Sequence, residues 1–415
     1  MGLGYVGLPL AVEFAGAGLK TVGIDVDGKK VDSVNRAKSY IGDVSEKDLA
    51  EVVKSGRLRA TTDFSVLAET DTVNIAVPTP LRKTKDPDIS YIVAALKEIR
   101  KYLHEGQLII LESTTYPGTT EEVMLPILEE SGLKVGKDFY LAFSPERVDP
   151  GNEKFNTRNI PKVVGGVTPE CTKLAAALYR SAGMNPVPVN SSRVAETVKL
   201  LENTFRSVNI GLVNEIALMC YRMGINVWEV IDAAATKPFG FMPFYPGPGL
   251  GGHCIPIDPF YLSWKAKQSG FDARFIELAG MINSDMPSQV VIRVSEALNE
   301  KKKCMNGSKI LIVGVSYKKD IDDTRESPAF DIIRLLRQRC ADVWWYDPFV
   351  EELDHNLEGV NKFDYSAKEL KTIDCAIVVT GHTKVDYDIL VKNCSLIFDS
   401  RNVLRNFTAS NIVRL

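Results

Sequence analysis

A glycine pattern at the start of the chain constrains its fold more than any other feature. Gly2, Gly4 and Gly7 spell G-x-G-x-x-G, and a helical stretch at residues 8–19 follows at once. This pattern makes a tight turn between a buried strand and a helix, so it predicts part of a βαβ unit. Only Met1 stands before Gly2, where the feeding strand is expected.

That strand normally lies in the middle of a doubly wound sheet, beside the point where the strand order reverses. Without it, neighbouring strands would keep buried N–H and C=O groups unpaired. The cost would exceed the roughly 5–15 kcal/mol by which a typical domain is stable. We therefore expect the natural chain to carry a short upstream strand of the kind that KILIV provides at 309–313, with Met1 in place of an internal apolar residue.

Apolar segments alternate with helical patterns along the chain. They predict strands at 21–25, 72–77, 108–111, 139–143 and 163–166. The alternation restarts at Lys309, and later strands are predicted at 341–348, 375–381 and 396–401. Strands that alternate with helices favour mostly parallel sheets. The predicted fold class is α/β, with two Rossmann-like, doubly wound parallel-sheet domains joined by a long central helix.

The central helix is predicted over residues 191–224, where apolar side chains recur at three- and four-residue steps. Its length exceeds that of typical globular helices, which indicates that it joins domains or packs against a second subunit. We expect three domains, at 1–190, 191–300 and 301–415. We also expect a homodimer through residues 191–223, with a higher homo-oligomer as the alternative.

Composition argues against several kinds of partner. A net charge of -3 gives no reason to expect nucleic acid or a membrane surface, and no apolar run approaches the roughly 20 residues of a membrane span. The N-terminus shows no signal-peptide pattern. The seven cysteines are dispersed and the four histidines show no ligand spacing. We expect reduced thiols, a cytoplasmic location and no metal.

Asp25 suggests what the glycine turn binds. It ends the strand predicted at 21–25, 18 residues after Gly7, near the spacing of about 20 expected for an acid that binds a dinucleotide's ribose hydroxyls. A carboxylate there would repel a 2′-phosphate, which favours NAD over NADP. The alternative is a structural glycine turn with a surface aspartate.

The segment FYPGPGLGGHCIPIDPF, residues 244–260, carries the most informative thiol. Cys254 follows several glycines, so backbone can approach a ligand closely, and successive N–H groups can bind an anion. Asp258 lies four residues on. A flexible linker with an incidental cysteine is the alternative. His253 is assigned to loop structure, and the other six cysteines are expected to be buried and inert.

Six segments in order resemble the UDP-glucose/GDP-mannose dehydrogenase family over essentially the whole chain. They are GLGYVGLPLA (2–11), ESTTYPGTT (112–120), SPER (144–147), AETVKLLEN (195–203), GGHCIPIDP (251–259) and YKKDIDDTRESP (317–328). The resemblance implies oxidation of a sugar C6 alcohol to a carboxylate with two NAD, without release of the aldehyde. A cysteine would capture the aldehyde as a thiohemiacetal, which becomes a thioester that water hydrolyses.

The resemblance also implies a set of site residues. Cys254 is the implied nucleophile. Lys199 and Asn203, four residues apart on one helix face, would stabilise an oxyanion, and Lys199 would assist proton transfer. Asp258 and Thr114 would position the hydrolytic water, and Glu146 would act as general acid/base. The implied cofactor-binding residues are Gly2, Gly4, Tyr5, Val6, Gly7, Asp25, Lys30, Thr114 and Arg325. The implied substrate-binding residues are Glu146, Arg147, Lys199, Asn203, Tyr245, Gly251, Lys318 and Arg401.

One position departs from the family's pattern. Some members carry a second glutamate four residues after the first, where this chain has Pro150, and the adjacent Asp149 is out of register. The segments around SPER and the cysteine loop look most like the branch that acts on UDP-N-acetylglucosamine. UDP-N-acetylmannosamine, UDP-N-acetylgalactosamine and UDP-glucose are the alternatives. The rival classes are a hydroxyacid-type dehydrogenase, which would have no use for Cys254, and a non-catalytic NAD- or sugar-binding protein.

Overall fold

A computed structural model describes residues 1–81, 86–148, 154–252, 254–353 and 360–415. The chain forms two compact units, each described by itself. Unit 1 comprises residues 1–202 and 260–272, and unit 2 comprises residues 203–259 and 273–415. The three-domain division expected from the sequence stays a prediction.

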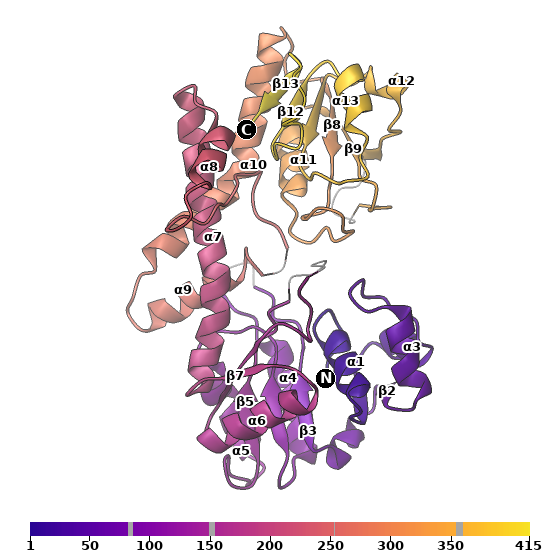
Figure 1. The fold of residues 1–415 in the computed structure, drawn as a ribbon, viewed down its shortest axis with the longest axis vertical. Coiled ribbons are helices and arrows are strands. Elements are labelled where there is room, and N and C mark those ends of the chain that lie inside the picture. The colour runs from indigo at the N-terminus through magenta and orange to yellow at the C-terminus, as the bar shows by residue number, and fades with distance from the viewer. Residues whose placement is uncertain (82–85, 149–153, 253, 354–359) are drawn as a thin grey trace. The chain divides into compact units, whose positions relative to one another are not determined.

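Unit 1 contains a sheet of five strands in the order β3-β4-β5-β6-β7 (Figure 1). Its neighbours run parallel, except that β6 is antiparallel to β5. The strands are β3 (Thr72–Ile75), β4 (Leu108–Leu111), β5 (Tyr140–Phe143), β6 (Lys162–Gly166) and β7 (Pro186–Pro188). The flanking helices are η1 (Phe64–Glu69), α4 (Ser90–Tyr102), η2 (Thr120–Met124), α5 (Leu125–Glu129) and α6 (Pro169–Ser181).

Strand β4 shows why the sheet forms. Its four residues, LIIL, are all buried, because helices cover both faces. Ile109 and Leu111 pack in the core that contains α4 and α5, whereas Leu108 and Ile110 pack in a second core with α6 and α1. A strand buried on both faces reads as a continuous apolar run, which is how this one was recognisable in the sequence.

The first glycine turn belongs to a smaller sheet in unit 1. Strand β1 (Thr21–Ile24) pairs in parallel with β2 (Leu58–Thr61). The helices beside it are α1 (Gly7–Gly16), α2 (Gly28–Asn35) and α3 (Glu46–Lys54). Met1 and Gly2 link β1 to β3: the Gly2 N–H donates to Ile24 O (2.7 Å), and the Ala76 N–H donates to Met1 O (2.8 Å).

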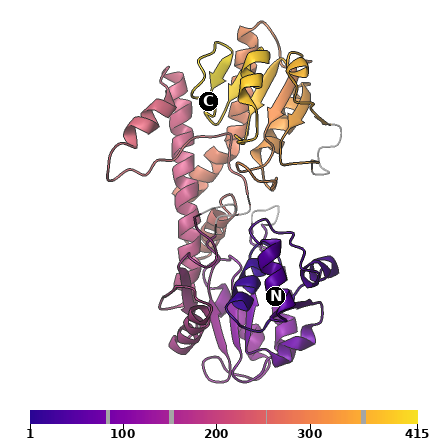
Figure 2. The same ribbon diagram turned by 45° about the vertical axis from the view of Figure 1, so that its right-hand side comes forward.

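Unit 2 contains a parallel sheet of six strands in the order β10-β9-β8-β11-β12-β13. The strands are β8 (Lys309–Val313), β9 (Asp342–Tyr346), β10 (Asn361–Lys362), β11 (Cys375–Val378), β12 (Ile397–Asp399) and β13 (Ile412–Arg414). The helices of this unit are α8 (Val227–Ala234), α10 (Arg274–Glu300), α11 (Pro328–Gln338), α12 (Ala367–Leu370) and α13 (Tyr387–Asn393). Helix α9 (Asp258–Gln268) begins in unit 2 and continues in unit 1. Figure 2 shows helices on both faces of this sheet, and the alternating residues of β8 divide between two cores. The predicted α/β class with mostly parallel sheets is confirmed.

Strand β8 lies between β9 and β11 in unit 2, and Met1 and Gly2 hold the corresponding position between β1 and β3 in unit 1. The Gly314 N–H donates to Tyr346 O (2.8 Å) and the Val379 N–H donates to Val313 O (2.9 Å), so Val313 corresponds to Met1. The strand expected upstream of Met1 stays a prediction.

Helix α7 (Ser192–Arg222) is the predicted long helix, with 31 residues that pass from one unit into the other. The described residues include no helix long and apolar enough to cross a membrane. Four of the six cysteines expected to be buried are buried, but that expectation is wrong for Cys304 and Cys340, which are exposed. Both lie at chain turns after helices rather than on apolar faces.

Candidate active site

The three glycines of the first turn have separate steric roles. Gly2 has φ +86°, and a Cβ built on it would lie 2.3 Å from Ala76 O. A Cβ on Gly7 would lie 1.8 Å from Gly2 O, so only glycine lets α1 approach the turn. A Cβ on Gly4 would meet nothing within 4 Å. Gly4 is therefore open to an approaching group, as the second glycine of a pyrophosphate-binding turn requires.

Asp25 follows β1 and is buried beside this turn. Its Oδ2 accepts a hydrogen bond from the Leu3 N–H (2.7 Å), and its Oδ1 accepts one from the Asp27 N–H (3.0 Å). Lys30 Nζ lies 3.7 Å from Oδ2. The carboxylate and Lys30 thus lie together at the strand end, whereas Tyr5 is exposed in the turn and Val6 precedes α1. Their contacts with NAD stay predictions.

The loop that carries Thr114 is anchored by a residue that sequence reasoning missed. Glu196, on α7, accepts hydrogen bonds from the Gly118 N–H (2.5 Å), the Thr120 N–H (2.9 Å) and the Thr120 hydroxyl (2.7 Å). Burial raises the pKa of Glu196 to about 7, against these hydrogen bonds. Its place in AETVKLLEN, three residues before Lys199, was the available signal.

Glu146 lies after β5, and its Oε1 accepts hydrogen bonds from the Arg147 N–H (2.7 Å) and the Val148 N–H (2.9 Å). The Arg147 guanidinium instead pairs with Glu202, with Nη2 2.5 Å from Oε1. Lys199 is buried and interacts electrostatically with Glu146. Unit 1 thus brings together Glu146 and Lys199. The predicted contact of Arg147 with substrate stays a prediction, and Asp149 and Pro150 lie outside the described residues.

Unit 2 gathers three of the predicted catalytic residues. Asn203 Nδ2 donates to Asp258 Oδ2 (2.5 Å), and both side chains are buried. The Asp258 N–H donates to Cys254 O (2.8 Å) at the start of α9, and Cys254 is exposed. This hydrogen bond joins the backbones of Cys254 and Asp258. The Asp258 carboxylate is held in turn by Asn203 of α7. His253 lies outside the described residues.

The glycines of the cysteine loop permit close packing. A Cβ on Gly251 would lie 2.6 Å from Tyr317 Cβ and 2.9 Å from Glu326 O. The Gly252 N–H donates to Arg325 O (3.0 Å), so the loop rests on the DTRES segment. The Arg325 guanidinium pairs with Asp323, and its predicted contact with NAD stays a prediction.

A cavity of about 590 Å³ lies in unit 2. The side chains of Trp228 and Tyr245, two of its walls, are stacked at 6.1 Å between ring centroids. Arg401, another wall, donates from Nε to Val379 O (2.9 Å), and burial lowers its pKa to about 10. Tyr245 and Arg401, both predicted to bind substrate, therefore line one cavity. The lining residues missed from the sequence include Trp228, Asp232, Lys319, His382, Tyr387 and Arg405.

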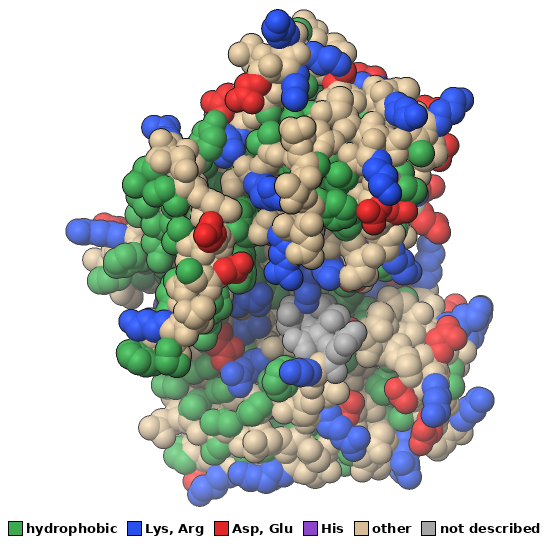
Figure 3. Space-filling model, turned by 45° about the horizontal axis from the view of Figure 1, so that its top comes forward, with side chains coloured by type: hydrophobic (Ala, Val, Ile, Leu, Met, Phe, Trp, Pro, Cys, Tyr) green, Lys and Arg blue, Asp and Glu red, His purple; other side chains and the backbone are tan. Residues whose placement is uncertain are grey.

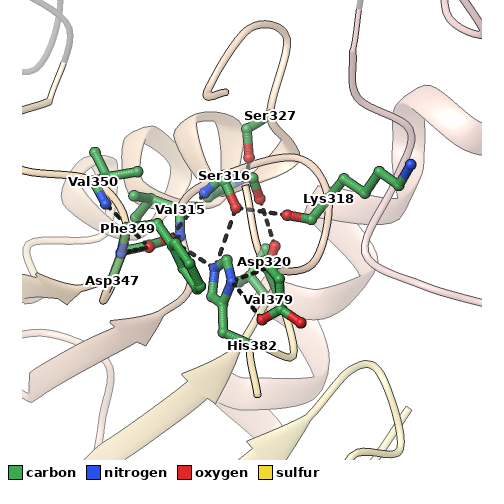
Figure 4. Close-up of polar contacts among 12 residues, drawn as sticks. Val315, Ser316, Lys318, Asp320, Ser327, Asp347, Phe349, Val350, Val379 and His382 are labelled. Atoms are coloured by element: carbon green, nitrogen blue, oxygen red, sulfur yellow. Dashed lines mark hydrogen bonds and ion pairs between the residues drawn. The ribbon is translucent and has the colours of Figure 1, made fainter. Parts of the chain in front are cut away.

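His382 lines this cavity and takes part in a network of polar contacts (Figure 4). Its Nε2 lies 2.9 Å from Asp347 Oδ2, and its Nδ1 accepts a hydrogen bond from the Asp320 N–H (2.9 Å). Ser316, also in contact with the ring, donates from Oγ to Lys318 O (2.8 Å). The segment that carries Lys318 is thereby tied to the strand ends of unit 2. The contact of the Lys318 side chain with substrate stays a prediction.

The folds and sites define a class: a dehydrogenase with a dinucleotide turn in one α/β unit and a polar, aromatic cavity in a second. Comparison with family models makes this specific. Residues 1–183 match the NAD binding domain of the UDP-glucose/GDP-mannose dehydrogenase family, residues 193–285 its central domain, and residues 311–406 its UDP binding domain. The chain belongs to this family and is an NAD-dependent UDP-sugar dehydrogenase.

Individual relatives are consistent with this family assignment. The chain is 38% identical over 358 residues to UDP-N-acetyl-D-glucosamine 6-dehydrogenase of Pseudomonas aeruginosa, covering 85% of this chain and 83% of the relative. It is 35% identical to UDP-N-acetyl-D-mannosamine dehydrogenase of Pyrococcus horikoshii, covering 98% and 95%. A solved structure of a Pyrococcus horikoshii UDP-D-ManNAc dehydrogenase superposes with a TM-score of 0.91 at 35% identity, covering 100% of this chain and 97% of that one.

The geometry of the glycine turn yields a prediction that separates binding from folding. We expect Gly4→Ala to melt as the wild type does, because its Cβ meets nothing in the protein. The methyl group would obstruct the pyrophosphate, so the Kd for NAD should rise about tenfold or more, measured by calorimetry.

Gly16→Ala, at the exposed end of α1, is the matched control. Its Cβ also meets nothing, and alanine is the better helix former by up to about 1 kcal/mol. NAD affinity should be unchanged in this variant. Wild-type NAD affinity in Gly4→Ala would show that the turn does not carry the pyrophosphate.

Proposed function

We propose that the enzyme oxidises the C6 alcohol of a UDP-N-acetylhexosamine to the uronate in two steps, through a covalent intermediate on Cys254. The observation that carries this proposal is the exposed Cys254 thiol in a loop whose backbone is hydrogen-bonded to the buried Asp258, itself held by Asn203. A simple alcohol dehydrogenase would need no nucleophile at this position.

NAD, when bound, accepts a hydride in each oxidation, and the open Gly4 and the Asp25 carboxylate fit its pyrophosphate and ribose. The chain's residues supply the remaining chemistry. Lys199 and Asn203, one helical turn apart, stabilise the C6 oxyanion, and Lys199 assists removal of the hydroxyl proton. The Cys254 thiolate attacks the aldehyde carbon to form a thiohemiacetal, whose oxidation gives a thioester.

Hydrolysis of the thioester completes the proposed cycle. Water adds to the acyl carbon, the C–S bond breaks, and the products are the sugar carboxylate and the Cys254 thiolate, with two protons released. One proton leaves as the water attacks, and the other is lost to solvent when the carboxylic acid ionises. Asp258 and Thr114 position this water, and Glu146 takes its proton. Asp258 already accepts a hydrogen bond from Asn203, which fixes the carboxylate's orientation beside the thiol-bearing loop.

The proposed place of the nucleotide is the 590 Å³ cavity of unit 2, a volume within the range of small-molecule sites. The stacked Trp228 and Tyr245 suit a planar base, and Arg401 suits phosphate oxygens. The neighbouring lysine that lines this cavity is Lys319, not Lys318. Gly247 leaves room for the guanidinium there, because a Cβ would lie 2.4 Å from Arg401 Nη1. Arg401 would therefore be displaced by any larger residue at that position.

UDP-N-acetylglucosamine is the proposed substrate. The support is the likeness of the segments around SPER and the cysteine loop to that branch, together with the relative of that name at 38% identity. We expect a higher kcat/KM for UDP-N-acetylglucosamine than for the mannosamine, galactosamine or glucose analogues, measured from NADH formation with each. A preference for any other of these UDP-sugars would overturn the assignment and leave the family intact.

The covalent mechanism predicts a specific loss in Cys254→Ala. Uronate formation should fall by on the order of 10³-fold or more, because the thiohemiacetal has no nucleophile to form on. The Kd for the UDP-sugar should change little. Cys304→Ala, which removes another exposed thiol, is the control and should keep full activity. Undiminished uronate production by Cys254→Ala would disprove the covalent step.

We also propose a homodimer through α7. Phe205, Leu212 and Met219 are exposed at seven-residue intervals on this helix, and Figure 3 shows hydrophobic side chains gathered on the flank where α7 and α8 lie in Figure 1. A solvent-exposed apolar face of this kind marks an interface. Sedimentation at micromolar concentration should give a dimer or a multiple of it, and Leu212→Glu should shift it toward monomer. Monomer alone in the wild type would contradict the proposal.

A further inference from the structure

Lys162 is a buried cation that the proposed mechanism does not use. It is the first residue of β6, and its side chain is 3% exposed. Its Nζ lies 2.8 Å from Glu112 Oε2 and 3.5 Å from Glu146 Oε2, so one ammonium group is shared between two carboxylates. The antiparallel pairing of β6 with β5 explains the placement: Phe143 pairs with Gly165, so β6 followed back to Lys162 runs beside the residues after β5, toward Glu146.

Glu112 has its other oxygen fully occupied. Oε1 accepts hydrogen bonds from Asn74 Nδ2 (2.8 Å) and from the Tyr179 hydroxyl. Lys162 Nζ also lies 5.3 Å from the centre of the Tyr179 ring. Strand β3, strand β4 and helix α6 therefore hold the Glu112 carboxylate in place, and Glu112 in turn holds Lys162.

Glu146 differs from Glu112 in having one carboxylate oxygen, Oε2, that is ion-paired with Lys162 but makes no hydrogen bond within the described part of the chain. Its Oε1 accepts two backbone N–H groups, whereas its Oε2 is buried and has no hydrogen-bond partner within the described part of the chain. A buried polar atom without a partner is rare in native proteins and calls for an explanation. An atom that accepts a hydrogen bond or a proton from a bound ligand would account for it.

The charges around Glu146 favour its ionised form. Burial would raise the pKa of the Glu146 carboxyl, but Lys162, the two backbone N–H groups and Lys199 outweigh burial and lower the pKa below its ordinary value. Lys162 itself stays charged, because Glu112 and Glu146 together offset its burial and raise its pKa. The Tyr179 hydroxyl stays protonated, since burial and Glu112 raise its pKa well above the ordinary value.

We infer that Lys162 is a positioning residue: by bridging Glu112 and Glu146, it holds Glu146 as a carboxylate whose Oε2 meets the ligand as an acceptor. The inference rests on the proposed role of Glu146 and sharpens it. A general acid/base can donate a proton or accept one, and Glu146 enters the cycle as the base that accepts one. In the proposed hydrolysis it takes a proton as the O–H bond of water breaks, and later returns that proton to solvent.

The decisive variant removes the bridge without leaving a buried charge unpaired. Glu112→Gln/Lys162→Met takes away one negative and one positive charge, and Lys199 remains in place to face Glu146. Without the nearer cation, Glu146 should protonate at higher pH, so the acid limb of the kcat–pH profile should move upward by about one unit or more. Lys162→Arg, which keeps the charge, should restore the wild-type limb.

Two controls assign the effect. In Glu112→Gln alone, Lys162 loses its pairing with the Glu112 carboxylate and keeps its pairing with Glu146. The acid limb of this variant's kcat–pH profile should therefore stay in place or move to lower pH. Lys134→Met, which breaks the exposed pair with Glu129 in the same unit, should leave the profile unchanged. A double variant whose acid limb coincides with that of the wild type would overturn the inference and make the bridge a structural ion pair only.

The proposed function is tested separately by Glu146→Gln. Full kcat in that variant would refute the role of Glu146 itself, whatever Lys162 does. Infrared difference spectra of the wild type against Glu146→Gln test the charge state even where the double variant fails to fold. At about pH 6 the wild type should show no protonated-carboxyl band from Glu146, and the presence of that band would overturn the inference.

Discussion

One contact recurs at the start of both α/β units and fixes the geometry of each: a strand-end carboxylate accepts the N–H just after a glycine turn. Asp25 Oδ2 takes the Leu3 N–H at 2.7 Å, and Asp347 Oδ2 takes the Val315 N–H at 2.8 Å. The turn is thereby fixed to the neighbouring strand. In unit 1 the carboxylate lies beside an open glycine, Gly4, whereas in unit 2 it is closed over by His382. The corresponding turns therefore have different surroundings, open at Gly4 in unit 1 and closed by His382 in unit 2.

Helix α7 connects this architecture to the chemistry. Glu196, Lys199 and Asn203 recur at three- and four-residue steps and so lie on one helix face. Each residue has a different role, since Glu196 holds the 112–120 loop, Lys199 interacts electrostatically with Glu146, and Asn203 orients Asp258. Lys199 and Asn203, which the proposed mechanism uses together, are therefore one helical turn apart on this face.

The sequence predicted the parts of this structure that depend on local patterns. Continuous apolar runs such as LIIL located the strands, and the glycine turns and the long helix were recognised from spacing. Buried charges could not be recognised, because Lys162 and Glu112 read as ordinary surface residues until β4 and β6 are folded into one sheet. Trp228 was missed as a cavity residue for the same reason, because its place beside Tyr245 depends on tertiary packing. The pairing of the Arg147 guanidinium with Glu202 was likewise not foreseen, and the predicted contact of Arg147 with substrate stays a prediction.

The central claim is that one active site carries out both oxidations of one sugar carbon and then hydrolyses a thioester. The most direct test is the number of NADH molecules formed for each UDP-N-acetylglucosamine consumed, with the product identified by mass. We predict two NADH and one UDP-uronate, with no free aldehyde. One NADH per sugar, with the aldehyde as product, would contradict this mechanism.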